Sequence, residues 1–146
     1  MEIRALTNVD LERVDAALPL SRLDQAQTYL VAWDGDEPVG HAHVAWQGTH
    51  LGLPEVQDVY VLPTRRREGV ATALTRASED AARRRGHARI SLSVSRDGNP
   101  AARRLYEQLG YRDAAVDPVR VQGAILLRGE RFEVDDTLLY LVKDLG

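Results

Sequence analysis

The fold of this chain is decided by the stretch VLPTRRREGVA, residues 61–71. It continues an apolar run, Val56–Leu62, that is typical of a buried strand. Arginines at positions 65 to 67 then form a turn, and Gly69 opens an alanine- and leucine-rich run that predicts a helix. A helix start exposes backbone N–H groups and the positive end of the helix dipole, and arginine adds bidentate hydrogen bonds to phosphate oxygens. The stretch therefore predicts a strand–turn–helix unit that binds a diphosphate.

Two common phosphate-binding motifs do not fit this stretch. A P-loop needs a lysine directly after its last glycine, but the only lysine in the chain is Lys143. A dinucleotide-binding turn needs two further glycines at fixed spacing, and Gly69 has no such companions. The pattern that remains is R-x-x-G-x-A over residues 66–71.

A second motif follows at residues 99–111, which read N-x-x-A-x-x-L-Y-x-x-L-G-Y. The first motif resembles the R/Q-x-x-G-x-G/A pyrophosphate loop of the GNAT superfamily, the acetyl-CoA-dependent N-acetyltransferases. The second resembles the N-x-x-A-x-x-L-Y-x-x-x-G-F/Y block of the same superfamily. The spacing of the two motifs also fits the superfamily, because a helix, a strand and a second helix are expected in that order across them. The resemblance covers residues 55–112, and Ala71 is an accepted variant of the usual glycine.

The resemblance implies an α/β (α+β) GNAT fold. This is a mixed, mostly antiparallel sheet of roughly six to seven strands, with helices on both faces and a central parallel pair of strands that splay apart. Hydrophobic periodicity and turn residues predict elements in the matching order. Strands are expected at 3–6, 29–33, 39–46, 55–62, 89–94 and 138–143, and helices at 8–18, 21–27, 69–85 and 100–109; the segment 111–132 has no clear pattern.

Length and composition predict one domain, residues 1–146, with an ordinary core. The chain has no cysteine, which excludes disulfides, a zinc–thiolate cluster and an acyl-cysteine intermediate. Without a long apolar run or an apolar signal core, we expect no membrane partner and a cytoplasmic location. The run Arg83–Arg85 lacks the aromatic residues and motif of a nucleic-acid site, so no nucleic-acid partner is expected.

The net charge of −3 conceals two oppositely charged parts. Residues 63–104 hold 11 Arg and four acidic residues, a charge of +7, and the rest of the chain holds eight basic and 18 acidic residues, a charge of −10. Such segregation favours an enzyme that binds a polyanionic cofactor and a cationic second substrate. Solvated surface charge explains the same composition equally well.

The resemblance assigns acetyl-CoA as the co-substrate and assigns residues to it. Backbone amides of the turn bind the pyrophosphate, the backbone at 59–61 binds the pantetheine arm as an added strand, and Asn99 caps its helix while also contacting the cofactor. The cofactor-binding residues expected are Val59, Tyr60, Val61, Arg66, Arg67, Glu68, Gly69, Val70, Ala71, Thr72, Asn99 and Arg103.

Tyr106 is the expected general acid. Periodicity alone places it on a core-facing stripe, but the superfamily directs this phenol at the cofactor sulfur. A phenol has an ordinary pKa near 10, so it still carries its proton at neutral pH and can protonate a departing thiolate.

Glu55 is the expected general base, because it falls where several superfamily members place a carboxylate or histidine. Period-2 alternation puts Glu55, Gln57 and Val59 on one strand face and Asp58 on the other. Asp58 and a water relay remain alternatives. His41 and His43 are read as ordinary strand histidines, and no metal site is expected.

The function expected is N-acetyl transfer from acetyl-CoA to a primary amine, by direct attack in a ternary complex. Two alternatives stay open: a CoA-binding regulatory module without turnover, and a protein N-terminal or lysine acetyltransferase instead of a small-molecule enzyme. The partner is thus a small-molecule or peptide amine, and a homodimer is left open.

Overall fold

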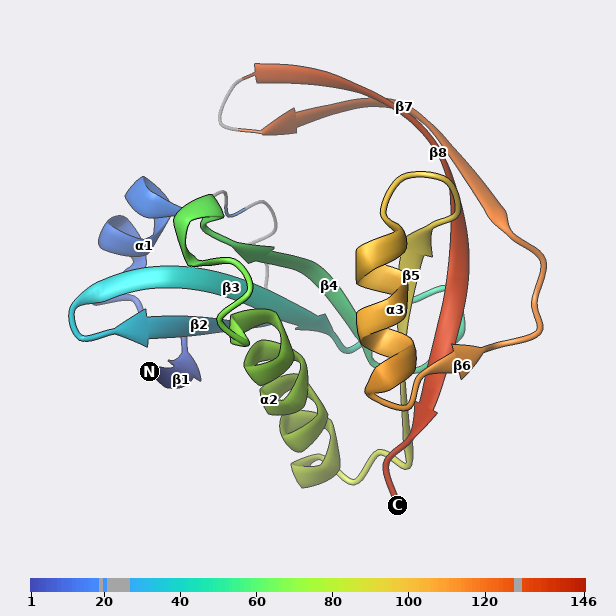
Figure 1. Ribbon diagram of the computed structural model, residues 1–146, viewed down its shortest axis with the longest axis horizontal. Coiled ribbons are helices and arrows are strands. Elements are labelled where there is room, and N and C mark those ends of the chain that lie inside the picture. The colour runs from blue at the N-terminus through green and yellow to red at the C-terminus, as the bar shows by residue number, and fades with distance from the viewer. Residues whose placement is uncertain (19, 21–26, 128–129) are drawn as a thin grey trace.

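The strands form one eight-stranded sheet in the computed structural model, which describes residues 1–18, 20, 27–127 and 130–146 (Figure 1). The strand order is β1-β2-β3-β4-β5-β8-β6, and β7 pairs with the free part of β8. The strands are β1 (Glu2–Ala5), β2 (Gln27–Asp34), β3 (Glu37–Ala45), β4 (Glu55–Val61), β5 (Arg89–Ser95), β6 (Arg112–Asp113), β7 (Val119–Leu127) and β8 (Glu130–Asp144). The helices are α1 (Leu11–Ala17), α2 (Val70–Arg84) and α3 (Pro100–Gln108), with a 3₁₀ turn, η1 (Pro63–Arg65), between β4 and α2.

The central strands β4 and β5 are the parallel pair of this otherwise antiparallel sheet. They pair only at Glu55 with Ser91 and at Val56 with Leu92, and beyond these positions each continues without the other. This confirms the expected mixed sheet with a splayed central pair. The opening between the two strands lies beside α3 (Figure 1).

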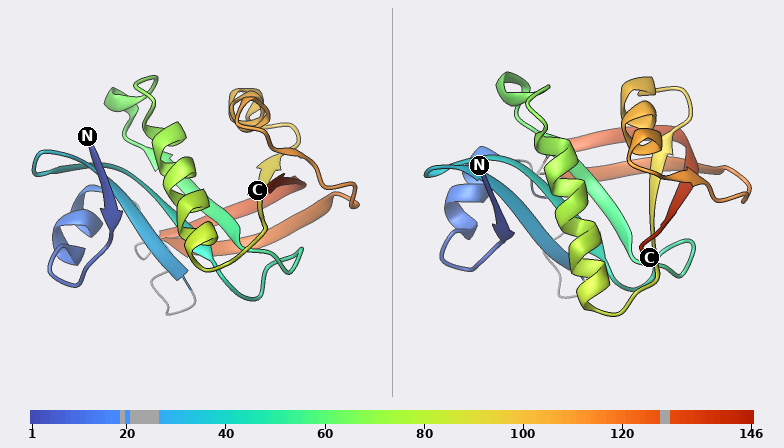
Figure 2. Two further views of the ribbon diagram at one scale, coloured as in Figure 1. Left: turned by 90° about the horizontal axis from the view of Figure 1, so that it is seen from below. Right: turned by 60° about the horizontal axis from the view of Figure 1, so that its bottom comes forward.

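Helices cover both faces of the sheet because the side chains of β2 alternate. Tyr29, Val31 and Trp33 pack in one cluster with α1, and Leu30 and Ala32 belong to the cluster that contains α2 and α3. Figure 2 shows α1 and α2 on opposite sides of the strands. The helix expected over Ser21–Gln27 lies outside the described residues except for Gln27, which begins β2.

Helix α2 packs closely on β3 at Gly40. A Cβ at this position would lie 2.8 Å from the carbonyl oxygen of Tyr60 and 3.1 Å from Cγ1 of Val70. A side chain would therefore force α2 and β4 away from β3, and the turn that links β4 to α2 would move with them.

The β7–β8 hairpin is larger than the sequence predicts, and it brings the strand total to eight. Leu138–Asp144 pairs with β5, as expected for a last strand, but β8 begins already at Glu130 and its first half pairs with β7. This half extends as an arm beyond the body of the sheet (Figures 1 and 2). In this arm the register places Arg120, Gln122, Glu133 and Asp135 on one face and Val119, Val121, Phe132 and Val134 on the other. None of the helices that the structure describes is long and apolar enough to cross a bilayer.

Candidate active site

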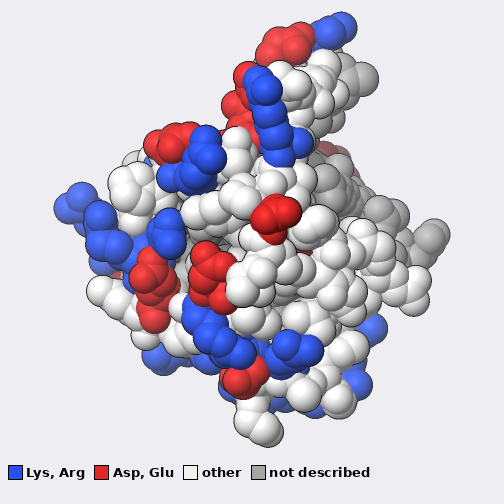
Figure 3. All heavy atoms as spheres, turned by 90° about the vertical axis from the view of Figure 1, so that its right-hand side faces the viewer, with Lys and Arg blue, Asp and Glu red and all other residues white. Residues whose placement is uncertain are grey.

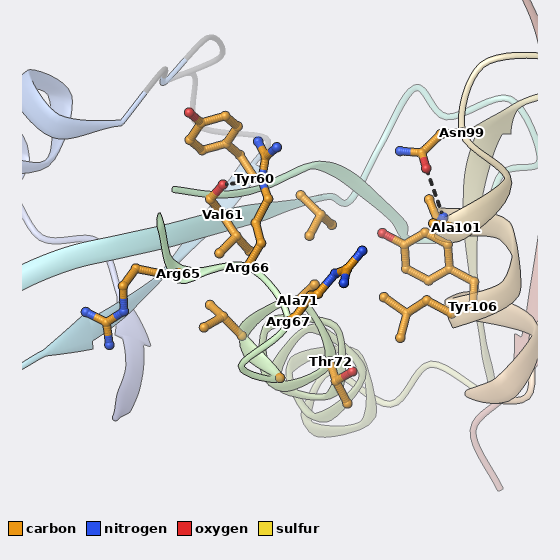
Figure 4. Close-up of a pocket in the computed structure, with 15 residues that line it drawn as sticks. Tyr60, Val61, Arg65, Arg66, Arg67, Ala71, Thr72, Asn99, Ala101 and Tyr106 are labelled. Carbon is orange, nitrogen blue, oxygen red and sulfur yellow. Dashed lines mark hydrogen bonds between the residues drawn. The ribbon is translucent and has the colours of Figure 1, made fainter. Parts of the chain in front are cut away.

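A first cavity of about 570 Å³ lies between the β4–α2 turn and α3 (Figure 4). It follows directly from the splaying of β4 and β5, because α3 stands on the far side of the opening. Most of the residues expected at the cofactor line it. The lining residues are Val59, Tyr60, Val61, Arg65, Arg66, Arg67, Gly69, Val70, Ala71, Thr72, Asn99, Ala101, Ala102, Leu105 and Tyr106.

The N-terminus of α2 offers unpaired backbone N–H groups to an anion in this cavity. Its N-cap, Gly69, has φ +82° and offers no side-chain hydrogen bond to the first turn. A Cβ at Gly69 would meet no protein atom within 4 Å, so the backbone beside it stands open. In contrast, α3 is capped by its own sequence: the amide N–H of Ala102 donates to Oδ1 of Asn99 at 3.0 Å. The first-turn amides of α2 are therefore the ones left to bind a ligand.

The arginines of the turn point in different directions (Figure 4). Arg65 turns away and pairs with Asp34 at 2.8 Å and with Glu68 at 3.1 Å. Arg66 donates from Nε to the carbonyl oxygen of Val61 at 3.1 Å, and its guanidinium lies 5.8 Å from the ring centre of Tyr60. The side chain of Arg67 extends across the cavity toward α3 (Figure 4).

Two residues expected at the cofactor lie outside the first cavity. Glu68 is held by Arg65, and Arg103 is paired with Glu107 one turn further along α3, at 3.0 Å. Both side chains are engaged with neighbours on the surface, and motif spacing alone does not reveal such pairing.

A second cavity of about 800 Å³ lies on the other side of Tyr106. Its acidic side chains are Glu55, Asp58 and Asp136, and no lysine or arginine of the described chain lines it. The first cavity has the opposite composition, with arginines and no carboxylate among its lining residues. The full lining is Gly48, Thr49, His50, Glu55, Val56, Gln57, Asp58, Val59, Leu92, Ser93, Val94, Ser95, Asn99, Ala102, Tyr106, Val121, Val134, Asp136, Leu138 and Tyr140.

Tyr106 borders both cavities, together with Val59, Asn99 and Ala102. Its side chain is 8% exposed, and its hydroxyl points from α3 into the gap between the helices (Figure 4). Burial raises the pKa of the Tyr106 phenol above its ordinary value, against a smaller lowering by a hydrogen bond with Thr75. The phenol thus keeps its proton at neutral pH and above.

Glu55 is buried at the base of the second cavity, with 6% of its surface exposed. Its Oε2 accepts a hydrogen bond from Nε2 of Gln57 at 2.6 Å. Its Oε1 is buried and has no hydrogen-bond partner among the residues that the structure describes. A carboxylate oxygen is costly to bury without a partner, so this atom is poised for a ligand proton or a water.

The alternation expected along β4 fails at Asp58. This residue has φ +52°, and the β3–β4 register shifts between His41 and His43. The positive φ brings Asp58 and Gln57 to the same neighbour: Asp58 Oδ2 lies 3.6 Å from Nδ1 of His43, and Gln57 Oε1 lies 2.9 Å from Nε2. Asp58 therefore does not point to the opposite side, and it lines the second cavity with Glu55.

Strand β8 contributes Asp136 and Tyr140 to this site, and the sequence did not predict the role of Tyr140. Burial and, to a smaller extent, the charge of Glu55 raise the pKa of Tyr140, which lies 4.5 Å from the ring of His50 between centroids. Asp136 accepts at Oδ1 from the hydroxyl of Ser95 and from the backbone N–H of Thr137. Only the pairing of β8 with β5 brings these residues to the cavity.

The sequence profile of the acetyltransferase (GNAT) family matches residues 3–111, which is most of the chain. The protein therefore belongs to the acetyltransferase (GNAT) family.

Sequence matches to two individual proteins cover only part of this chain. The chain is 38% identical over 88 residues to the mycothiol acetyltransferase of Clavibacter sepedonicus, covering 60% of this chain and 28% of that protein. It is 33% identical over 86 residues to the thialysine N-epsilon-acetyltransferase of Caenorhabditis elegans, covering 56% and 51%. The matches thus span about half or less of these relatives' length. A crystal structure of nourseothricin acetyltransferase superposes with a TM-score of 0.71 at 19% identity, covering 99% of this chain and 98% of the other, which shows the shared fold.

Proposed function

We propose that this protein transfers an acetyl group from acetyl-CoA to a primary amine by direct attack in a ternary complex. The observation that carries the proposal is the position of Tyr106, whose side chain borders an arginine-lined cavity on one side and a carboxylate-lined cavity on the other. A polyanionic donor and a cationic acceptor would meet at this residue.

The residues of the first cavity fit acetyl-CoA. The uncapped amides of α2 and the guanidinium groups of Arg66 and Arg67 are the donor set that a pyrophosphate requires. The backbone of residues 59–61 has no partner on β5, so it is free to pair with the amides of a pantetheine arm on that side. When bound, acetyl-CoA supplies an acetyl group activated as a thioester.

Residues of the chain handle two protons in this reaction. The acceptor nitrogen forms a bond to the acetyl carbon while the carbon–sulfur bond breaks, and a strand N–H polarises the carbonyl. Oε1 of Glu55 takes the proton that the amine gives up, directly or through a water, with Asp58 as the alternative base. Tyr106 gives its phenolic proton to the departing sulfur and regains one from solvent.

The acceptor is proposed to be a cation with a primary amine. The reason is local: Glu55, Asp58 and Asp136 are the charged side chains of the second cavity. The acidic balance of the whole chain is a weaker argument, because acidic and basic side chains lie next to one another on the face shown in Figure 3. A protein N-terminus or lysine would satisfy the same chemistry as a small amine.

The test is release of free CoA from acetyl-CoA with a panel of primary amines and basic peptides, with the acetylated product identified by mass spectrometry. Turnover with at least one cationic amine is expected. A chain that binds acetyl-CoA but acetylates no member of the panel would favour a regulatory CoA-binding module. A chain that does not bind acetyl-CoA at low ionic strength would contradict the proposal as a whole.

A further inference from the structure

We propose that Gln57 and His43 position the catalytic carboxylate of Glu55, as a hydrogen-bonded row of side chains that holds Oε2 and leaves Oε1 to the acceptor. This inference rests on the proposed function, because it assigns positioning residues to that reaction. Its observations are two hydrogen bonds, from Gln57 to Glu55 and between Gln57 and His43, and a third contact of 3.6 Å between Nδ1 of His43 and Oδ2 of Asp58, which together run from β4 to β3 and back.

The direction of each hydrogen bond follows from the carboxylate. An ionised Glu55 can only accept, so the group 2.6 Å from its Oε2 must be the amide NH₂ of Gln57. The Gln57 carbonyl then faces Nε2 of His43 at 2.9 Å, and this nitrogen must carry a proton. The charge state of Glu55 thus fixes the amide orientation of Gln57 and the protonated nitrogen of His43.

This row of side chains lies where the backbone pairing of β3 with β4 is irregular. Between His41 and His43 the pairing of β3 with β4 shifts register, and Asp58 on the opposite strand has φ +52°. Side-chain contacts from His43 to both Gln57 and Asp58 span this irregular step. The imidazole is fully buried, at 0% exposure, so it is a rigid anchor for a segment in which regular strand pairing is broken.

The two carboxylate oxygens of Glu55 therefore have different roles in the proposed reaction. Oε2 is held by Gln57, and Oε1 has no partner among the described side chains and backbone. A carboxylate fixed by one oxygen presents the other in a single orientation, which lowers the entropic cost of proton transfer. Without Gln57 the carboxylate would lose the donor that fixes its orientation.

The test is a double-mutant cycle on turnover. Gln57→Met keeps the length of the side chain and removes both hydrogen bonds. In the otherwise unchanged protein we expect it to lower kcat roughly tenfold to a hundredfold, the equivalent of one hydrogen bond to a charged group, with the KM for acetyl-CoA unchanged. In the Glu55→Ala background the same substitution should change kcat by less than about twofold, because Gln57 acts only through Glu55.

The matched control is Thr28→Val, which removes a partly buried hydrogen bond from Nε1 of Trp46 at 2.9 Å and a longer one from Arg85 at 3.5 Å, at the start of β2 and outside the lining of both cavities. It should lower the thermal midpoint without lowering kcat. An equal loss of kcat from Gln57→Met in both backgrounds would overturn the positioning role, and so would an unchanged kcat in the single variant.

A measurement on the unaltered protein makes the inference independent of whether the variant folds. Nitrogen-15 spectra of the imidazole, assigned by the contact of its ring with that of Tyr29 at 4.7 Å between centroids, should show a proton on Nε2 of His43. If only Nδ1 carried a proton, Nε2 would accept from the amide NH₂ of Gln57. The amide would then be reversed, and the proposed row of hydrogen bonds would be wrong. Absence of any turnover with intact Nε2 protonation would instead count against the proposed function.

Discussion

The rings of Tyr106 and Tyr111 meet edge to face with centroids 5.9 Å apart, yet their hydroxyl groups lie in different surroundings. The Tyr111 hydroxyl donates to Oε2 of Glu79 at 2.9 Å inside the core, and Oε1 of the same carboxylate accepts from Nζ of Lys143. The Tyr106 hydroxyl points from α3 into the gap between the helices (Figure 4), and the side chain lines both cavities. We therefore expect Tyr111 to contribute to stability and Tyr106 to the proposed reaction, so that each provides a control for the other.

Tyr106→Phe should lower kcat by roughly a hundredfold to ten-thousandfold, the usual contribution of a positioned acid. Only the hydroxyl is lost, so the Kd for acetyl-CoA should stay within about twofold of its original value, as calorimetry would measure. Tyr111→Phe should keep its kcat per folded molecule. If Tyr106→Phe turns over normally while chemistry limits the rate, Tyr106 is a core residue and not the acid.

Tyr111→Phe should change stability in a pH-dependent way. Burial, followed by the charge and hydrogen bond of Glu79, raises the pKa of Tyr111 well above its ordinary value. In the unfolded chain the phenol loses its proton near pH 10, but in the folded protein it keeps it, so the unfolded state binds fewer protons above that pH. The stabilisation is therefore complete below about pH 10 and declines as pH rises, by up to about 1.4 kcal/mol per pH unit.

Urea denaturation between about pH 8 and pH 11 would measure this slope. The Phe variant should have a lower free energy of unfolding at neutral pH, by about 1–3 kcal/mol, because Oε2 of Glu79 loses its donor. Its alkaline decline should be shallower than that of the parent protein. Identical alkaline slopes in both proteins would show that Tyr111 ionises normally in the folded state.

Arg66→Ala and Arg67→Ala should each weaken acetyl-CoA binding by roughly tenfold to a hundredfold at low salt, the equivalent of one charge-assisted hydrogen bond. The difference from the parent protein should shrink as salt screens the interaction. Arg65→Ala is the matched control from the same turn, because Asp34 and Glu68 already pair with this guanidinium. Titration calorimetry at two salt concentrations would decide, and equal losses for all three variants would mean that the turn acts only through its overall charge.

Glu55→Gln should reduce activity most at low pH, where the acceptor amine is most fully protonated and a base is most needed. At high pH part of the amine is already neutral, so the defect should shrink. A kcat/KM profile over about pH 6–10 would measure this trend. A uniform loss would indicate that Glu55 orients the acceptor, and a normal rate would transfer the role to Asp58 or to water.

Local patterns in the sequence were sufficient to predict the structure of the β4–α2 turn and of the start of α3. The arginine turn, the positive-φ glycine at position 69 and the Asn-Pro start of α3 are short-range features, and each lies where the motifs predict. Surface ion pairs are not visible in motif spacing, so the sequence did not predict that Arg65 pairs with Glu68 and that Arg103 pairs with Glu107.

The acceptor side depends on long-range pairing that periodicity cannot supply. Strict alternation along β4 predicted opposite directions for Gln57 and Asp58, but the positive φ at Asp58 breaks it. Asp136 and Tyr140 reach the second cavity only because β8 pairs with β5. Such contacts between distant segments leave no local pattern in one sequence.

Asp136→Asn should weaken binding of an acceptor that carries a second positive charge. Of the acidic residues near the start of β8, Asp136 lines the second cavity, whereas Glu133 pairs with Arg131 and Asp135 pairs with Arg120. The Arg120 guanidinium also holds the pKa of Asp135 below its ordinary value. Removing the charge of Asp136 should therefore raise KM, and removing that of Asp135 should not.

The measurement compares two acceptors of equal length, a diamine and an amino alcohol, in Asp136→Asn and in the control Asp135→Asn. The expected rise in KM is about threefold for the diamine in Asp136→Asn, close to the upper range for a solvent-screened ion pair. The KM for the amino alcohol and that for acetyl-CoA should not move. Asparagine keeps the Oδ1 acceptor for the Ser95 hydroxyl, so the cavity wall should survive the change. Equal KM values for both acceptors in both variants would remove Asp136 from acceptor recognition, and a preference of the parent enzyme for an anionic amine would overturn the charge argument while leaving the acetyl-CoA proposal intact.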